Sequence, residues 1–557
     1  MSISGGLAMY VYCDRPYLPF AKTLAMLTLC FTVLQTLPVH AQKSGLAPGL
    51  ADTKSAIVQI LAKEGRLPGH LQRVRSSLKS HYVDNDGPVY WVGTGRMTPF
   101  IQRLVFAEED GLKSQDYPVE YLITLRDGLN AADPVSAGFT ELAFSAYFVR
   151  YASDLKIGRF IPHKIDPKLF QKRRKINLVE VLGQLANYKQ ATAYLRDIEP
   201  QNPHYRALKT VLRQYRDIAD KGGWGAIPTG PTLKPGMMDA RVPKIRAWLG
   251  KAGDMTPSPV AEPELYDPAM ALAVQQFQRR HGLNDEGIIG KLTLTQMNIS
   301  VEERIRQVIV NMERWRWMPE DMGERHFMVN IAAFELQRIN SGSVLERIPV
   351  VVGKAYHQTP VFSDKMEYLE LNPTWTVPYS IATKEMLPKL KQNPNHLGDS
   401  FQLLAAGQSI PFSSVDFNQY STANFPYTIR QGPSEKNALG RVKFIFPNRH
   451  SVYLHDTPSR SLFARNSRAF SHGCVRVYKP IKFAENILAD VPEWSPGKIR
   501  KVLASKQTTR VNLPKHIPVH IVYASAYRGE GGTIEFRPDI YGRDKKLYRA
   551  LFGKPTS

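Results

Sequence analysis

Cysteine is scarce in this chain, and the usual sequence signatures of metal and nucleotide binding are missing. The 557 residues contain three cysteines, Cys13, Cys30 and Cys474. No C-x-x-C or H-E-x-x-H pattern occurs, and Cys474 alone cannot build a structural zinc site from sulfur ligands. Phosphate-loop and dinucleotide-binding fingerprints are also absent. The sequence therefore predicts an activity without a metal ion or an organic cofactor.

A hydrophobic run long enough for a comfortable membrane span is missing from the N-terminal region. Residues 24–34 are apolar and follow the basic residues Arg15 and Lys22, but the run is too short for such a helix. It is followed by Val39-His40-Ala41, which fits a cleavage site with small residues. We expect residues 1–41 to be a cleaved signal peptide and the mature protein to be periplasmic. If residues 1–41 stay attached, they are a marginal membrane anchor.

Cleavage near Ala41 removes Cys13 and Cys30 and leaves Cys474 as a lone thiol. An intramolecular disulfide is then impossible. In an oxidising compartment a single thiol is exposed to intermolecular pairing and over-oxidation, so it needs deep burial or a chemical task. Burial is the default interpretation for a lone cysteine, and the neighbouring residues must decide.

Acidic residues are outnumbered by basic ones. Lysine and arginine total 73 against 50 acids, which gives a formal net charge of +23 and a pI near 9.7. Such a chain favours anionic partners. Export disfavours nucleic acid, so an anionic polymer of the cell envelope is the expected partner. With 43% hydrophobic residues the chain is also predicted to fold.

Hydrophobic periodicity divides the chain into three parts. Residues 51–230 show apolar positions at three- and four-residue spacings and predict a helical domain. Residues 231–300 predict a compact helical unit, in which Asp267 and Pro268 start a helix and Gly282 follows its end. Beyond an amphipathic connector, residues 320–557 alternate in a strand-like manner, with a hairpin around Ser341-Gly342. The predicted class is multidomain α+β.

An insertion interrupts the strand pattern at about residues 380–440. It contains a helical fragment near residues 385–390, several prolines and many polar residues. Long insertions in compact domains are often lids or binding loops, and a surface excursion without function is the alternative.

The strongest chemical signal is Ser471-His472-Gly473-Cys474-Val475-Arg476, preceded by Tyr453-Leu454-His455. A cysteine nucleophile needs a nearby imidazole to take its proton. His455 is preferred over His472 as this base, because a neighbouring strand can bring an imidazole to the thiol better than a residue two positions away. Gly473 allows close backbone approach, so the amides of Gly473 and Cys474 are candidate oxyanion donors. Arg476 can hold a carboxylate.

These segments resemble the signature of L,D-transpeptidases, in which a histidine precedes an S/T-H-G-C motif by about fifteen residues. Here residues 456–470 fill that gap. The segments Val352-Gly353-Lys354, Thr359-Pro360, Asn372-Pro373 with Trp375, and residues 437–444 extend the resemblance to the large Gram-negative branch of the family. Residues 231–300 resemble a peptidoglycan-binding-like domain, which either binds glycan or serves as a spacer. The departure is Arg476, where many family members have asparagine.

The resemblance implies a helical scaffold, a peptidoglycan-binding-like domain and a catalytic β-sandwich with an inserted lid. It implies that Cys474 attacks the bond between the third residue of a tetrapeptide stem and its terminal D-alanine, and that a second stem resolves the thioester to form a cross-link between third residues. His455 is then the base, and Ser471, His472, Arg476, Tyr453 and Trp375 line the substrate pocket. For His472 the alternative is a structural role in its loop, and for Arg476 it is a structural ion pair. The resemblance also implies that carbapenems acylate Cys474.

Other classes fit less well. A papain-like protease has its cysteine before its histidine and a different motif around it. A wall-binding scaffold with an inert catalytic domain is the non-enzymatic alternative, but it would be favoured by a missing cysteine or histidine. The acceptor remains open between a second stem, water, a free D-amino acid and a lipoprotein, and other wall synthases are candidate partners.

Overall fold

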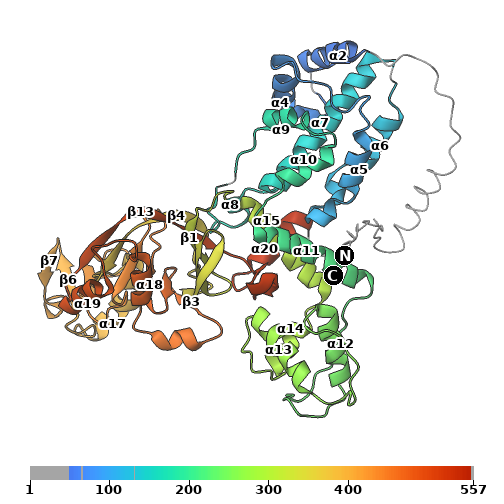
Figure 1. Cartoon of the computed structure of the whole chain (residues 1–557). Coiled ribbons are helices and arrows are strands. Elements are labelled where there is room, and N and C mark those ends of the chain that lie inside the picture. Colours follow the sequence, from blue (N-terminus) through green and yellow to red (C-terminus); the bar gives the residue numbers. More distant parts are fainter. Residues whose placement is uncertain (1–48, 64–66, 131, 173, 554–557) are drawn as a thin grey trace, which may run out of the picture.

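The computed structural model describes residues 49–63, 67–130, 132–172 and 174–553. The predicted signal peptide at residues 1–41 lies outside them. Within the described ranges, no helix combines the length and apolar character needed to cross a bilayer. Figure 1 shows a helical region at the top, a small helical unit at the bottom and a β-rich region at the left. The predicted multidomain α+β class is confirmed.

The helical region is built around one long helix, α7 (Pro134–Ile157). Asp133 caps it by accepting a hydrogen bond from the Val135 amide, and Pro134 occupies its first turn. Most of its residues are buried, as expected for a helix surrounded by others. Around it lie α2 (Leu50–Ala62), α3 (Gly69–Gln72), α4 (Arg75–Lys79), α5 (Met97–Val105), α6 (Val119–Asp127), α8 (Pro162–Ile165), α9 (Leu178–Leu185) and α10 (Ala191–Ile198).

The small unit contains α12 (Val242–Ala252), α13 (Pro268–Arg280) and α14 (Lys291–Met297). Its predicted helix boundaries are confirmed. The Asp267 carboxylate accepts from the Met270 amide at 2.8 Å, and Gly282 takes a left-handed φ of 67° just after the helix. Trp248 packs edge-on against Phe277 in the core of this unit.

Two helices connect the parts at the centre of the molecule, α11 (Pro203–Asp220) and α15 (Val301–Trp317) (Figure 1). They pack against each other, so α11 joins this centre although the sequence interpretation placed it in the helical region. The C-terminal half of α15 is buried, including the charged side chains of Glu313, Arg314 and Arg316. Glu313 pairs with Arg316 at 3.1 Å, both side chains being fully buried, and accepts from the Arg159 amide at 2.7 Å. The α15 helix thus holds the helical region against the rest of the chain.

The β-rich region contains one nine-stranded sheet in the order β11-β3-β12-β10-β9-β4-β13-β1-β2. The strands are β1 (Arg325–Asn330), β2 (Glu335–Asn340), β3 (Ser343–Gly353), β4 (Phe362–Leu371), β9 (Val442–Ile445), β10 (Leu454–His455), β11 (Ala469–Ser471), β12 (Val475–Val477) and β13 (Thr509–Val522). The predicted hairpin is formed by β2 and β3. Because β3 pairs with β2 as well as with β11 and β12, the sheet closes on itself. The helices α18 (Pro480–Ile487) and α19 (Pro496–Ser505) pack on it.

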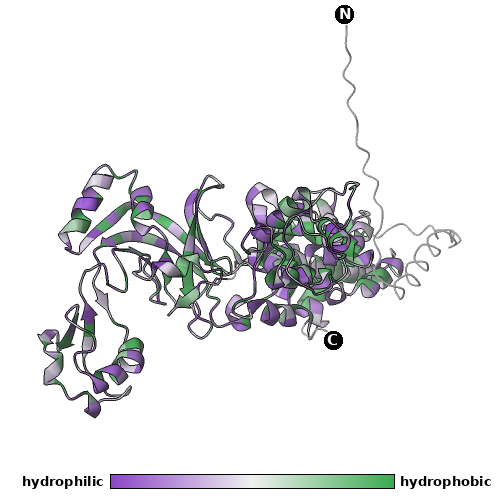
Figure 2. Ribbon diagram, turned by 90° about the horizontal axis from the view of Figure 1, so that it is seen from below, coloured by the Kyte–Doolittle hydropathy of each residue, from purple (hydrophilic) through white to green (hydrophobic). Residues whose placement is uncertain are grey.

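Residues 375–431, here called the cap, form a folded unit rather than an irregular excursion. The cap has a four-stranded sheet in the order β5-β8-β6-β7 and its own hydrophobic core. Its elements are β5 (Trp375–Thr376), α16 (Tyr379–Ile381), a π-helical turn at residues 382–386, α17 (Leu387–Gln392), β6 (Phe401–Ala405), β7 (Gln408–Ile410) and β8 (Thr428–Gln431). In Figure 2 this lobe lies apart from the larger sheet, at the lower left. The strands escaped the sequence interpretation because they are short and interrupted by proline and polar residues.

The C-terminal segment, residues 523–553, contacts every other part except the cap. It contains β14 (Ala526–Arg528), β15 (Ile534–Phe536) and α20 (Arg543–Phe552). Arg537 donates to the Arg280 carbonyl in the small unit, and Arg314 of α15 pairs with Asp544 at 2.6 Å. Arg159 of the helical region donates to the Leu551 carbonyl, and Tyr541 donates to the Gly353 carbonyl at the end of β3. The C-terminal segment therefore joins the helical region, the small unit and the large sheet.

The buried pair on α15 gives a stability prediction. Glu313→Ala leaves the Arg316 guanidinium buried without its carboxylate, which should lower the free energy of unfolding by about 3–5 kcal/mol. Chemical denaturation monitored by tryptophan fluorescence measures this loss. Glu302→Ala, at an exposed position of the same helix, is the matched control and should change stability by less than about 0.5 kcal/mol. Equal stability of the two variants would contradict a supporting role for the pair.

Candidate active site

Parallel pairing of β10 with β12 places the predicted site residues on one face of the sheet. Leu454 is opposite Val475 and His455 is opposite Arg476. Because side chains alternate along a strand, Leu454 and Val475 point into the core, where both are fully buried. Tyr453, His455, Cys474 and Arg476 occupy the alternating positions on the opposite face. The structure thus brings these four predicted residues together.

A cavity of about 450 Å³ lies over this face, between the sheet and the cap. Its floor comes from the sheet and from the Ser471–Cys474 loop, and its roof includes Trp375 at the start of the cap. The lining residues are Trp375, Pro378, Ile381, Glu385, Met386, Lys389, Leu397, Ala438, Leu439, His450, Ser451, Tyr453, His455, Ser471, His472, Cys474 and Arg476. Of the predicted site residues, Gly473 alone does not line it.

The Cys474 side chain is half-buried, and its surroundings favour the protonated thiol. Burial raises its pKa above the ordinary value, although the Tyr453 amide and hydroxyl, and then the charges of Lys443 and Arg476, act in the opposite direction. The thiol donates to the Ser451 carbonyl at 3.6 Å. The amide and the hydroxyl of Tyr453 both make hydrogen-bonding contacts with the same sulfur. Sequence reasoning placed Tyr453 only in the pocket, and the register of β10 against β12 explains the closer position.

His455 is buried and neutral. Burial, followed by the charge of Arg476, lowers its pKa to about 3. Its Nδ1 is 2.5 Å from the Asp456 carbonyl oxygen. A carbonyl oxygen accepts a hydrogen bond, so Nδ1 carries the proton and Nε2 has the lone pair of the neutral ring. The backbone of Leu439 makes a further hydrogen-bonding contact with this ring. Nε2 can therefore accept a proton, as a general base requires. The thiol's own hydrogen bond goes to Ser451, so proton transfer to His455 requires a rotation of the thiol when substrate binds.

The loop of Ser471, His472 and Gly473 is held by hydrogen bonds of its own. The Ser471 hydroxyl donates to the Cys474 carbonyl at 2.5 Å and accepts from the Gly473 amide at 3.1 Å. The Gly473 amide, predicted as an oxyanion donor, is thus engaged within the loop, whereas the Cys474 amide donates to no described residue. Gly473 has a φ of 121°, and a Cβ there would meet nothing closer than 3.9 Å. Backbone conformation rather than space is therefore what requires glycine.

His472 connects this loop to the cap. Its Nε2 is 2.7 Å from Glu385 of the cap, and its ring lies 4.9 Å from that of His357. The structure thus shows a partner for His472 that the sequence analysis did not contain. Glu385 carries no sequence signal for this contact, because it lies 87 residues away in the chain.

Arg476 lines the floor of the cavity, and Lys443, which does not line it, lies beside that floor on β9. Lys443 lies opposite His455 on β9, with its ammonium 4.5 Å from the ring centre of Tyr453 and 3.4 Å from Glu370. Arg476 makes no ion pair with a described residue, and its buried Nε has no hydrogen-bond partner among them. Its guanidinium is therefore available to an anionic group in the cavity. Within the described ranges, no cluster of His, Cys, Asp and Glu has the arrangement of a metal site.

Three family models match separate parts of this chain. Residues 324–512 match the L,D-transpeptidase catalytic domain, residues 76–212 match the Scaffold domain, and residues 239–297 match the "Putative peptidoglycan binding domain". The resemblance to the L,D-transpeptidase family is thereby confirmed for residues 324–512, which match the catalytic domain of that family.

A curated protein of Haemophilus influenzae, named "Putative L,D-transpeptidase", is 35% identical over 251 residues, which are 44% of this chain and 50% of that protein. The chain thus spans about half the length of this curated relative. An L,D-transpeptidase structure from Stackebrandtia nassauensis has 16% identity and a TM-score of 0.22, covering 55% of this chain and 100% of the other. The structure of LdtMt1 in complex with imipenem has 15% identity and a TM-score of 0.17, covering 36% and 59%. At these TM-scores the two structural matches carry no argument.

The protonated thiol and the neutral imidazole predict how the rate of Cys474 alkylation depends on pH. The rate at which iodoacetamide modifies Cys474 should rise with pH through and beyond 9, because the thiolate forms only above the ordinary thiol pKa. Lys443→Met should move this rise to still higher pH, since the lost positive charge favoured the thiolate. Peptide mass spectrometry after timed alkylation measures both rates. A rate plateau between pH 5 and 8 would indicate a preformed thiolate and imidazolium pair and would contradict the prediction.

Proposed function

We propose that this chain is a peptidoglycan L,D-transpeptidase that uses Cys474 as its nucleophile. The Cys474 sulfur attacks the carbonyl between the third residue of a tetrapeptide stem and its terminal D-alanine, and the thiol proton passes to Nε2 of His455. The carbon–nitrogen bond breaks, His455 returns the proton to the amine, and D-alanine leaves. The side-chain amine of the third residue on a second stem then attacks the thioester carbonyl and forms an amide bond as the carbon–sulfur bond breaks. The proton that the amine loses passes through His455 to the released sulfur and restores the Cys474 thiol.

The observation that carries this proposal is the placement of Cys474, Tyr453 and His455 in one covered cavity. The Nδ1 contact to Asp456 leaves Nε2 of His455 as a proton acceptor, and both partners are neutral before substrate arrives. Attack and proton transfer therefore occur together, as in general-base catalysis, rather than from a stored thiolate. The Cys474 amide is the free backbone donor closest to the nucleophile and supplies the oxyanion contact.

The charges around the cavity support a stem peptide as the substrate. Stem peptides carry carboxylates, and Arg476 on the floor and Lys389 on the cap both face the cavity without an ion pair to a described residue. Glu385 at the rim offers the opposite charge, which suits the amine of a diamino acid. A diamino third residue, meso-diaminopimelate in the Gram-negative relatives that the sequence resembles, carries both kinds of group.

The rest of the chain fits an enzyme of the periplasm that works on the cell wall. The peptidoglycan-binding domain at residues 239–297 gives a second contact to the polymer, and the net charge of +23 favours an anionic one. Periplasmic export through residues 1–41 and association with other wall synthases belong to the same proposal.

A product assay tests the reaction. Purified protein is incubated with disaccharide-tetrapeptide, and the products are identified by mass spectrometry. The expected product is a dimer that has lost one D-alanine, formed by the unaltered protein and not by Cys474→Ala.

Other products would change the conclusion. Cysteine-dependent tripeptide without dimer would show that water is the acceptor and would replace transpeptidation by hydrolysis. The absence of any cysteine-dependent product would contradict the proposal and favour a wall-binding scaffold.

Arg476 should determine donor binding. Arg476→Met removes a charge-assisted hydrogen bond to a stem carboxylate, so kcat/KM should fall by about 10- to 150-fold, the equivalent of about 1.5–3 kcal/mol. Arg430→Met, at an exposed position of β8 outside the cavity, is the matched control and should leave kcat/KM unchanged. If Arg476→Met retains full kcat/KM but loses stability, the guanidinium is structural and the carboxylate contact is wrong.

A further inference from the structure

The carbonyl of Gly473, next to the nucleophile, is held by a residue from a different loop. The buried Thr359 hydroxyl donates to the Gly473 carbonyl oxygen at 2.9 Å and accepts from the Gly353 amide at 2.9 Å. Thr359 thereby connects the end of β3 with the Ser471–Cys474 loop. It does not line the cavity and makes no contact with the thiol.

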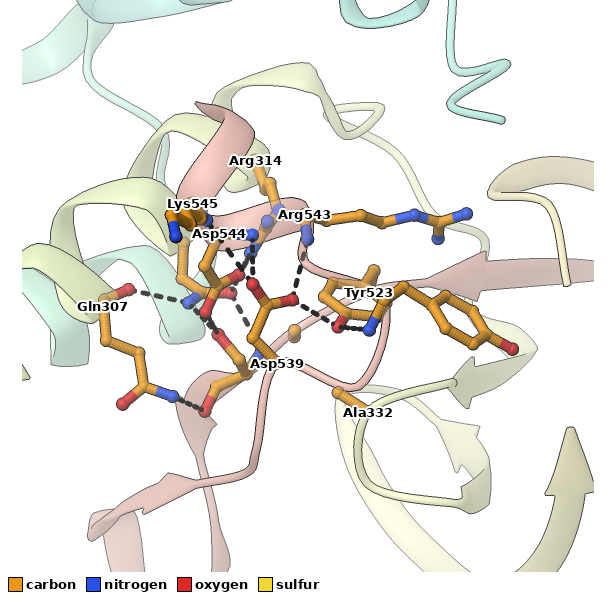
Figure 3. A network of polar contacts seen from close by, with 12 residues as sticks. Gln307, Arg314, Ala332, Tyr523, Asp539, Arg543, Asp544 and Lys545 are labelled. Atoms are coloured by element: carbon orange, nitrogen blue, oxygen red, sulfur yellow. Dashed lines mark hydrogen bonds and ion pairs between the residues drawn. The ribbon is translucent and has the colours of Figure 1, made fainter. Parts of the chain in front are cut away.

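Tyr541 of the C-terminal segment holds Thr359 in turn. Its hydroxyl donates to the Gly353 carbonyl at 2.5 Å and accepts from the Thr359 amide at 3.3 Å. The Tyr541 backbone amide donates to the Tyr523 hydroxyl at 3.0 Å, and the two rings stack with centres 5.7 Å apart. Tyr523 is itself fixed by donating to Asp539 at 2.6 Å, a contact that Figure 3 shows between the labelled residues.

Asp539 and Arg543 extend this network to α20 and to the helical region. The Asp539 carboxylate accepts from the backbone amides of Arg543 and Asp544 (Figure 3). The Arg543 guanidinium donates to the Thr359 carbonyl at 3.3 Å and lies 3.7 Å from Asp166, just after α8. Two backbone hydrogen bonds also join Val361 to residues 168 and 170. The loop around Thr359 is therefore held by segments outside residues 324–512, the range of the catalytic domain match.

The hydrogen bond from Thr359 to the Gly473 carbonyl also orients the Cys474 N–H, because both groups belong to one planar peptide unit. The described residues contain no cis peptide bond, so the Cys474 N–H points away from the Gly473 carbonyl of the same peptide unit. Fixing that carbonyl on Thr359 fixes the opposite direction of the Cys474 N–H. This peptide rotates about ψ of Gly473 and φ of Cys474, and a glycine, which has no Cβ, restricts its own backbone rotation less than any other residue.

We propose that Thr359 and Tyr541 are positioning residues that orient the Gly473–Cys474 peptide, so that the Cys474 amide is presented to the oxyanion of the transition state. The inference rests on the proposed acyl transfer by Cys474, because an oxyanion forms in that reaction. Alkylation of the thiol forms no oxyanion and therefore serves as a control. It assigns a role in catalysis to the C-terminal segment, which supplies Tyr541.

Thr359→Val and Thr359→Ser form a matched pair that tests this role in the full chain. The valine variant should lower kcat for the tetrapeptide by about 10- to 100-fold, somewhat less than the full loss of an oxyanion donor. KM and the rate of Cys474 alkylation by iodoacetamide should stay within about twofold, because neither depends on the oxyanion contact. Thr359→Ser keeps the hydroxyl and should restore kcat to within about threefold of the unaltered protein.

Tyr541→Phe gives a second test if the valine variant does not fold. It should lower kcat by about 3- to 10-fold by loosening Thr359. The matched control is Tyr548→Phe in α20 of the same C-terminal segment; the Tyr548 hydroxyl makes no contact with this network, so the change should have no effect. A kcat equal to that of the unaltered protein in Tyr541→Phe and Thr359→Val, or alkylation that falls in parallel with kcat, would overturn the positioning role. Failure of the unaltered protein itself to turn over the stem would instead overturn the proposed function.

Discussion

The short parallel pairing of β10 with β12 is the constraint on which the site depends. It aligns two pairs of alternating residues, Tyr453 with His455 and Cys474 with Arg476, on the face below the cap. Leu454 and Val475 are fully buried on the other face. A shift of one residue would move Cys474 into the core and Val475 into the cavity, at the cost of exposing apolar surface. Packing on the core side thus fixes the register, and the register fixes the chemistry.

Burial controls the protonation of the two central groups. It raises the pKa of Cys474 and lowers the pKa of His455 to about 3, so both are neutral near pH 7. The positive charges of Lys443 and Arg476 favour the thiolate and oppose a protonated His455. In the proposed reaction, the same charges therefore stabilise the Cys474 thiolate after the thiol loses its proton and favour release of that proton from His455. A neutral resting pair also protects the lone thiol, because oxidation proceeds through the thiolate.

The sequence was sufficient to predict the domain order, the main strands and the residues of the cavity floor. Strand-like alternation and the hairpin at Ser341-Gly342 marked the β-rich region, and the chemistry of Cys474 and His455 marked the candidate site within it. Contacts between distant segments could not be predicted in this way. Glu385 meets His472 across 87 residues, and Thr359 meets Gly473 across 114. The insertion itself was predicted, but its small sheet and separate core were not, because they come from short strands whose periodicity is too brief to detect.

Support for the reactive loop extends well beyond the sheet that carries it. The Ser471–Cys474 loop has few backbone partners in its own strands, since β11 and β12 are three residues long. A glycine at its centre with φ of 121° adds freedom. A loop with so little local restraint needs contacts from elsewhere to hold an amide within hydrogen-bond geometry. Those contacts come from Thr359 and, through Tyr541 and Arg543, from the C-terminal segment and the helical region. The parts of the chain that surround the large sheet therefore belong to the structure that shapes the candidate active site, in addition to any binding of the polymer.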